Sequence, residues 1–137
     1  MFANVKTNTE QGNIGEARAI YDLTRLGYVI SKPLFVNTKY DLIVDDGKRL
    51  FRVSVKTSGH RKGSGYEVTL ATKGGNSKVN TIRGRQKEDW DMLFVLVENG
   101  DSYLIPSEHL GDAKHAIVVG RTKYNEFKLG CVPYGSL

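Results

Sequence analysis

The sequence is poor in cysteine, proline and long apolar runs, and each absence excludes a class of protein. Cys131 is the one cysteine among 137 residues, so the chain can form no internal disulfide and no cysteine-based zinc site. Only three prolines are present, and no proline-rich linker, repeat or low-complexity tract divides the chain. No run approaches the ~18 apolar residues of a membrane span, and the first residues lack the apolar core of a signal peptide. We therefore expect a soluble, cytoplasmic protein without a membrane partner.

The length and composition indicate one basic domain. A chain of 137 residues that is 39% hydrophobic can bury a single modest core. We expect one domain over residues 1–137, with a core at about 7–110 and a C-terminal extension at 111–137. Lys and Arg number 20 against 15 Asp and Glu, for a formal charge of +5. This excess favours a phosphate-bearing partner, although many small basic domains have none.

The first predicted element is a helix over residues 7–26. Thr7 and Glu10 fit a capping box, Gly12 leaves a later start near Asn13 open, and Gly27 suits the residue after the helix end.

The periodicity of this helix places Glu16 near the middle of an apolar face, with Asp22 on the opposite side. A carboxylate on an apolar face is costly unless a cation, a metal or solvent compensates it. Two interpretations stay open: Glu16 belongs to a site, or it interacts with the helix dipole at the first turn.

After this helix the sequence predicts mostly strands. The expected strands lie at 28–30, 40–45, 50–57, 66–72, 92–97, 102–105, 116–119 and 126–129, with one helical turn at 106–110. Asp46-Gly47 is a strong hairpin signal between the second and third of these strands. The pattern is typical of an α/β fold with a mixed central β-sheet flanked by helices.

The predicted hairpin carries polar groups suited to phosphodiester hydrolysis. Asp41 opens its first strand, and Ser54 and Lys56 share one face of the second. Hydrolysis of a phosphodiester needs a divalent cation, and Mg²⁺ prefers oxygen ligands, usually one or two carboxylates plus water. Asp41 and Glu16 are the candidate carboxylate donors, and the backbone carbonyl of Val55 is a further one. Lys56 would lie beside the attacking water.

These residues carry a family resemblance. The set Glu16, Tyr40-Asp41 and Ser54-Val55-Lys56-Thr57 resembles the PD-(D/E)xK nuclease superfamily, most closely its small group I intron-associated homing endonucleases. The stretches GNIGEARAIYDLTRLGY and NTKYDLIVDDGKRLFRVSVKTS carry it over residues 12–58, and DWDMLFVLVENGDSYLIPSEHL extends it more weakly.

The resemblance implies a restriction endonuclease-like core, which is a mixed four-stranded sheet flanked by helices. It also implies that Asp41 is the principal metal-binding aspartate, Lys56 the catalytic lysine and Glu16 a helix glutamate that assists metal or water binding.

Two positions depart from the family pattern. Tyr40 replaces the proline before the aspartate, and the homing branch often has an aromatic residue there. Ser54 replaces the acidic residue or glutamine two positions before the lysine, so one negative charge is missing. Ser54 would bind metal through water, or Glu67 on the next strand would replace the lost ligand. Glu67 has an alternative role as a surface partner of Arg52 or Lys56.

Basic residues after the hairpin are candidates for DNA contact, since seven cations lie in two expected loops, 58–65 and 73–87, that contain no acid. These residues are Arg61, Lys62, Lys73, Lys78, Arg83, Arg85 and Lys87. A solvated basic loop is the alternative interpretation. Asp89 and Asp91 flank Trp90, either as a second metal pair or as the structural end of the loop.

The sequence thus predicts a Mg²⁺-dependent DNA endonuclease in which Mn²⁺ can substitute, acting as a homodimer or homotetramer. A Holliday-junction resolvase of the same fold and a catalytically silent DNA-binding relative are the alternatives.

Overall fold

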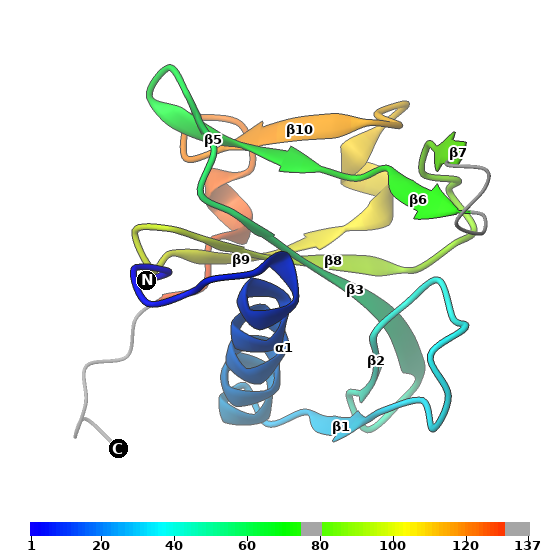
Figure 1. The fold of residues 1–137 in the computed structure, drawn as a ribbon. Helices are drawn as coiled ribbons and strands as arrows, with labels where there is room; N and C mark the ends of the chain where they lie inside the picture. Colours follow the sequence, from blue (N-terminus) through cyan, green and yellow to red (C-terminus); the bar gives the residue numbers. More distant parts are fainter. Residues whose placement is uncertain (75–80, 131–137) are drawn as a thin grey trace.

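The computed structural model describes residues 1–74 and 81–130, which form a central sheet with a helix on one face and a second sheet on the other (Figure 1). The central sheet has five strands in the order β1-β2-β3-β8-β9. Their bounds are Val29–Ser31, Leu42–Asp45, Leu50–Ser58, Met92–Val97 and Ser102–Pro106. Neighbouring strands are antiparallel except β3 and β8, which run parallel. The predicted α/β class with a mixed central sheet is therefore confirmed.

Helix α1 spans Asn8–Arg25 and begins at the predicted capping box. The Thr7 hydroxyl accepts a hydrogen bond from the backbone N–H of Glu10 at 3.1 Å. The Glu10 carboxylate in turn accepts one from the backbone N–H of Lys6 at 2.7 Å. The first bond satisfies an N–H group that the first turn leaves free, and the second holds the chain just before the cap. The helix therefore begins at Asn8, and the alternative start near Asn13 is wrong.

The helix ends at the predicted glycine. Gly27 has a φ of 92°, a left-handed conformation that glycine adopts without strain. The backbone N–H of Tyr28 then donates to the carbonyl of Leu23 at 3.2 Å, which closes the end of the helix.

The buried face of α1 consists of Gly15, Ala19 and Leu23. A Cβ at Gly15 would overlap the Thr57 methyl group of β3, so glycine permits the close approach of helix and strand. Asp22, predicted on the solvent side, instead accepts a hydrogen bond at 2.7 Å from the buried Ser102 hydroxyl. Compared with the predicted apolar face, the buried face of α1 is therefore rotated toward Asp22. Glu16 lies at the border of the buried face rather than in its middle.

Strands β2 and β3 form the hairpin predicted from Asp46-Gly47. The Asp46 carboxylate accepts two backbone N–H groups of the turn at 2.8 and 2.9 Å, and Gly47 takes a φ of 91°. Strand β2 has four residues and β3 has nine, so their pairing ends at Leu42 opposite Val53. On its other edge β3 pairs with β8 as far as Ser58. Beyond Val53, therefore, β2 no longer covers its edge of β3.

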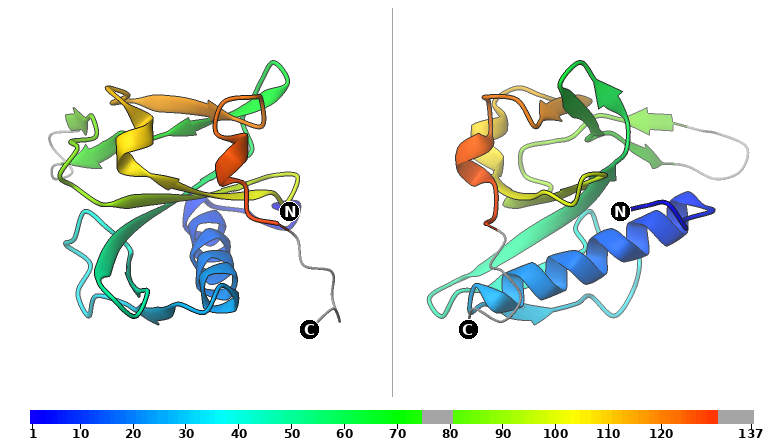
Figure 2. Two further views of the ribbon diagram at one scale, coloured as in Figure 1. Left: turned by 180° about the vertical axis from the view of Figure 1, so that it is seen from behind. Right: turned by 90° about the vertical axis from the view of Figure 1, so that its left-hand side faces the viewer.

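The second sheet has the order β10-β5-β4 and lies on the face of the central sheet opposite α1 (Figure 2). Its strands are Ala116–Val119, Gly65–Thr69 and Arg61–Lys62. Among the residues that the structure describes, this sheet covers the face where the resemblance predicts a further helix. The loop expected at 58–65 contains β4, which pairs with β5 as a short hairpin.

The central sheet buries one apolar cluster on each face. The cluster toward α1 includes Ala19, Leu23, Leu42, Val53, Phe94 and Leu96. The cluster toward the second sheet includes Val68, Leu70, Leu93, Val95, Ile105 and Val119. Because side chains alternate along a strand, Ser54 and Lys56 face the second sheet.

Two strands connect the second sheet to β8. The predicted strand at 66–72 is interrupted, because β5 ends at Thr69 and β6 spans Thr72–Gly74. Strand β6 pairs with β7, Thr81–Arg83, as an antiparallel ribbon.

The end of the described chain packs onto the same core. A 3₁₀ turn, η1, spans Ser107–Leu110, and β10 and the buried Tyr124 follow beyond the predicted core boundary. The edge strand expected at 126–129 is wrong: a 3₁₀ turn, η2, spans Asn125–Phe127, and a single bridge then joins Lys128 to Tyr103. Across residues 1–74 and 81–130, no helix combines the length and apolarity needed to cross a bilayer.

Candidate active site

Asp41 lies immediately before β2 and directs its carboxylate at the edge of β3. Its backbone N–H donates to the Val53 carbonyl at 2.9 Å, and its Oδ2 accepts a hydrogen bond from the Val55 N–H at 2.7 Å. Burial raises the pKa of Asp41, the Val55 N–H and Lys56 oppose that rise, and Glu16 adds to it. The side chain thus continues the hydrogen bonding of β2 and places a carboxylate where the strand stops.

Lys56 lies on β3, next to Val55 in the chain, and faces the second sheet with Ser54. It is partly buried, and this burial lowers the pKa of its ammonium group while Asp41 opposes the shift. A lysine with a lowered pKa exchanges a proton at neutral pH more readily than an exposed one. Asp41 and Lys56 therefore form an electrostatically coupled acid and base at one point of the sheet.

The backbone of Val55 adds a second oxygen at this edge. In a strand, the N–H and the C=O of one residue point to the same side. Since the Val55 N–H points to Asp41, its carbonyl lies on the Asp41 side as well. Ser54 precedes it, opposite Leu93 of β8, and is only 3% exposed. A short neutral hydroxyl in this place is a weaker metal ligand than the carboxylate usual in the family.

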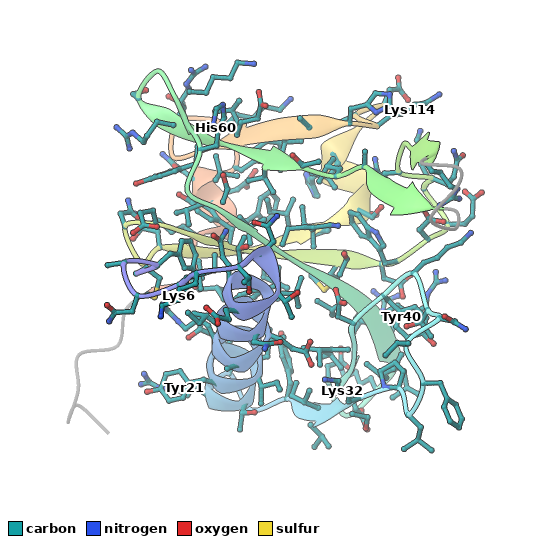
Figure 3. The ribbon with its side chains drawn as sticks, viewed as in Figure 1. Lys6, Tyr21, Lys32, Tyr40, His60 and Lys114 are labelled. Carbon is teal, nitrogen blue, oxygen red and sulfur yellow. The ribbon has the colours of Figure 1, made fainter. Side chains whose placement is uncertain are left out.

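Glu16 reaches the site from α1 and is held by a lysine that the sequence interpretation missed. Its carboxylate forms an ion pair with Lys32, which lies just after β1 and beside α1 in Figure 3. The hydrogen bond from Glu16 raises the pKa of Lys32. No direct signal in the sequence points to this lysine. The pairing of β1 with β2 places Ser31 opposite Ile43, so that the next residue, Lys32, comes close enough to act on the charge of Asp41.

Glu67, the candidate replacement for the missing ligand, is not brought to Asp41. It lies on β5 and pairs with Lys62 of β4 at 2.8 Å. The hydrogen bond from Lys62 lowers the pKa of Glu67, and Asp41 and Lys56 have no part in this shift. Its observed partner also differs from the two partners that were expected, Arg52 and Lys56.

Arg85 is a structural residue, which corrects its predicted contact with DNA. It is 4% exposed and donates to two backbone carbonyls and the Ser107 hydroxyl at 2.9 to 3.0 Å. Its guanidinium also lies 5.3 Å from the centre of the Trp90 ring. All of these partners belong to the protein itself. Arg85 therefore connects the segment before β8 to the residues in and just after η1.

Other charged residues of this segment are paired as well. Arg83 pairs with the buried Asp89 at 3.0 Å, and Lys87 pairs with Asp112 at 3.2 Å. Asp91 accepts the backbone N–H of Arg52 at 2.8 Å and its guanidinium at 3.3 Å. Arginines thus hold both Asp89 and Asp91, which favours the interpretation of these two acids as the structural end of the loop. We call residues 83–91 the arginine segment.

The remaining predicted DNA-binding cations have different placements. Arg61 stacks over Tyr66 at 4.8 Å, and Lys62 is held by Glu67. The backbone of Lys73 lies in β6. Lys78 lies outside the described residues.

The oxygens at the edge of β3 suit a hard divalent cation. Asp41 and Glu16 are the carboxylates that would hold such an ion, and the Val55 carbonyl would be a further oxygen ligand. Within residues 1–74 and 81–130, no three His, Cys, Asp or Glu side chains gather into a metal cluster. Two carboxylates together with water and phosphate oxygens are the usual ligands of Mg²⁺. Glu16 already binds one cation in this structure, the Lys32 ammonium group.

Comparison with known families decides the classification. Residues 6–128 match the PD-(D/E)XK endonuclease family. The chain belongs to this family. Its members generally use divalent metal ions, in keeping with the oxygen ligands described above.

Comparison with solved structures gives one match of the same fold and one of low structural similarity. The bacterial homing endonuclease I-Ssp6803I superposes with a TM-score of 0.73 and 24% sequence identity, over 88% of this chain and 82% of the other. MepB gives a TM-score of 0.39 at 18% identity, over 75% of this chain and 78% of the other. No curated protein matches the sequence.

Proposed function

We propose that this family member is a Mg²⁺-dependent DNA endonuclease that hydrolyses phosphodiester bonds of duplex DNA. The single observation that carries the proposal is the hydrogen bond from the Val55 N–H to the Asp41 carboxylate at 2.7 Å, next to Lys56. It lies on the edge of β3 that β2 leaves uncovered beyond Val53, which we call the open edge of β3. This arrangement gathers a metal ligand and a proton-exchanging lysine on rigid strands. A homing-type role on a long target fits the resemblance of residues 12–58.

Each residue of the site has a role in this proposal. Asp41, Glu16 and the Val55 carbonyl would hold the Mg²⁺, for which Mn²⁺ can substitute. A bound divalent cation offsets the charge that develops on the phosphate and lowers the pKa of a coordinated water. Lys56 takes or shares the proton of the attacking water, which its lowered pKa favours. To hold the metal, Glu16 would have to give up its ion pair with Lys32.

One such site cuts one strand of a duplex. Cutting both strands therefore requires a second copy of the chain, as a homodimer or homotetramer. The net charge of +5 favours the approach of every copy to the phosphate backbone.

The proposal is tested with Asp41→Asn, because asparagine still accepts the Val55 N–H but loses the charge. Wild type should cut supercoiled plasmid in Mg²⁺ and not in EDTA. The variant should be slower by about a thousandfold or more, since the metal contributes several kcal/mol to the barrier. Glu67→Gln is the matched control and should cut at the wild-type rate. Absence of metal-dependent cutting above Asp41→Asn, on plasmid, linear or branched DNA, refutes the proposal.

Ser54 favours a second candidate, a DNA-binding relative without catalysis. The buried serine leaves the site one negative charge short. This candidate predicts metal-independent binding that weakens steeply with salt, and no cutting by wild type. A four-way junction in the same assay identifies the third alternative, because a resolvase nicks junctions symmetrically and leaves linear duplex intact.

A further inference from the structure

The loop between β1 and Asp41 carries three apolar side chains that point away from the protein. Leu34 is 91% exposed, Phe35 80% and Val36 96%. We call these three residues the apolar tip. Large apolar side chains exposed singly are common, but three in a row on one loop mark a contact surface.

The loop that presents the apolar tip is held at both ends. Lys32 forms its ion pair with Glu16 of the site. At the other end, Lys39 pairs with the buried Asp89 at 3.4 Å, and the Thr38 hydroxyl donates to the Tyr40 carbonyl at 2.6 Å. In Figure 3, the labelled Lys32 and Tyr40 mark the two ends of this loop. The ends of the loop are therefore held by the body of the protein, and Asp41 follows the second end directly.

Charge favours a nucleic-acid partner for this loop. Residues 32–40 contain two lysines and no acid, and although Lys32 pairs with Glu16 and Lys39 with Asp89, the whole chain carries +5. A second copy of the chain would bring the same positive charge. Three side chains also offer much less than the ~800 Å² that each partner buries in a stable interface. Apolar wedges beside cations are a known means of separating stacked base pairs in the minor groove.

We propose that the apolar tip inserts into the minor groove and unstacks a base step of duplex DNA next to the phosphate held at Asp41. This inference rests on the proposed function, because it assumes that DNA binds at the edge of β3. Phe35 is the wedge, and Leu34 and Val36 cover the exposed faces of the separated base pairs. The kink that follows brings the backbone toward Lys32 and Lys39.

The test uses two 40-base-pair duplexes of one sequence, one fully paired and one with a single-base bulge, each with 2-aminopurine at the same step. Binding is measured with Ca²⁺ in place of Mg²⁺, which keeps the DNA intact. Wild type should bind the bulged duplex about tenfold more tightly, because its stacking is already broken, and should raise 2-aminopurine fluorescence in the paired duplex.

The triple variant Leu34→Ser, Phe35→Ser, Val36→Ser should lose both effects and keep salt-dependent binding. Leu50→Ser is the matched control, because Leu50 is 65% exposed on the hairpin and should behave as wild type. Circular dichroism checks that each variant is folded.

Three outcomes overturn the inference. Equal preference for the bulged duplex in wild type and triple variant excludes a wedge. A wild-type dimer that becomes monomeric only in the triple variant, by light scattering, assigns the apolar tip to a second copy. Loss of the preference in Leu50→Ser as well excludes a local effect. None of these readouts depends on cleavage. If the wild type cuts plasmid while one of these outcomes is found, the wedge is excluded and the proposed function stands.

Discussion

The open edge of β3 and the arginine segment are both rich in charged residues, but they use the charges in opposite ways. In the arginine segment, Arg85 donates its hydrogen bonds to acceptors inside the protein, and Arg83 forms an ion pair with the buried Asp89. At the open edge, burial shifts the pKa values of Asp41 and Lys56 toward each other. Paired charges stabilise the fold, whereas charges with shifted pKa values in a partly buried place are suited to chemistry.

The largest expected effect is a loss of cleavage activity, which should follow from a change at the open edge of β3 and not from a change elsewhere. Lys56→Met should lower the single-turnover cleavage rate by about 10²–10⁴-fold, the usual contribution of a positioned proton-transfer group, and should leave DNA affinity nearly unchanged. Lys62→Met is the control, because that lysine pairs with Glu67 on β4 and β5. Equal loss in both variants would show that the lysines act only through general positive charge.

The next effect separates the regions by stability. Arg85→Met should lower the free energy of unfolding by about 3 kcal/mol, because its buried acceptors lose charged partners. Urea denaturation measures the change, and cleavage per folded molecule should stay at the wild-type value. Lys87→Met should be almost neutral, since both members of its pair with Asp112 are exposed. A fully stable Arg85→Met that no longer binds DNA would restore the original interpretation of this arginine.

A smaller effect, on metal affinity, is expected for Lys32, the cation that pairs with Glu16. Lys32→Met should tighten Mn²⁺ binding by roughly three- to tenfold, because it removes both a competitor and a nearby positive charge. Calorimetry on the DNA-free protein measures this affinity. Lys39→Met, at the other end of the same loop, pairs with Asp89 and should not change it. Weaker Mn²⁺ binding in Lys32→Met would mean that Lys32 orients Glu16 instead of competing for it.

The smallest effect is a difference in how stability depends on pH. Asp41 has a folded pKa above its ordinary value of 3.8, mainly because of burial, so its ionised form costs stability at neutral pH. Asp41→Asn should therefore unfold at higher urea than wild type at pH 7, and this gain should shrink as the pH falls through the raised pKa.

Asp46 gives the opposite sign and serves as the control. Backbone N–H bonds, from Arg49 first and then Lys48, lower the pKa of Asp46, so its charge stabilises the fold above its ordinary pKa of 3.8. That contribution disappears as the pH falls through the lowered value, and Asp46→Asn should be less stable than wild type at pH 7. Equal signs for the two aspartates would contradict the burial argument for Asp41.

The elements with strong local signals were predicted well. The cap at Thr7, the turn at Gly47 and the apolar run of β8 each depend on residues that are close in sequence. The edge strand at 126–129 failed because one strand-like run carries no information on whether a neighbouring strand is within reach. The placement of Asp22 failed because the angle of the helix against β3 depends on the contact at Gly15.

The candidate site was only partly predictable. Asp41 and Lys56 come together because one hairpin carries both, and the hairpin was evident from its turn. Lys32 was missed because its partner Glu16 lies on another element. Arg85 was misassigned because its acceptors lie 22 to 28 residues further along the chain.

By itself, the sequence determined the capped helix, the β2–β3 hairpin and the order of the residues that resemble a nuclease. Only the tertiary structure decided which charges are paired and which remain at the open edge of β3. The physical reason is that hydrogen bonding and periodicity act over a few residues, whereas burial and ion pairing depend on elements that meet only when the chain is folded.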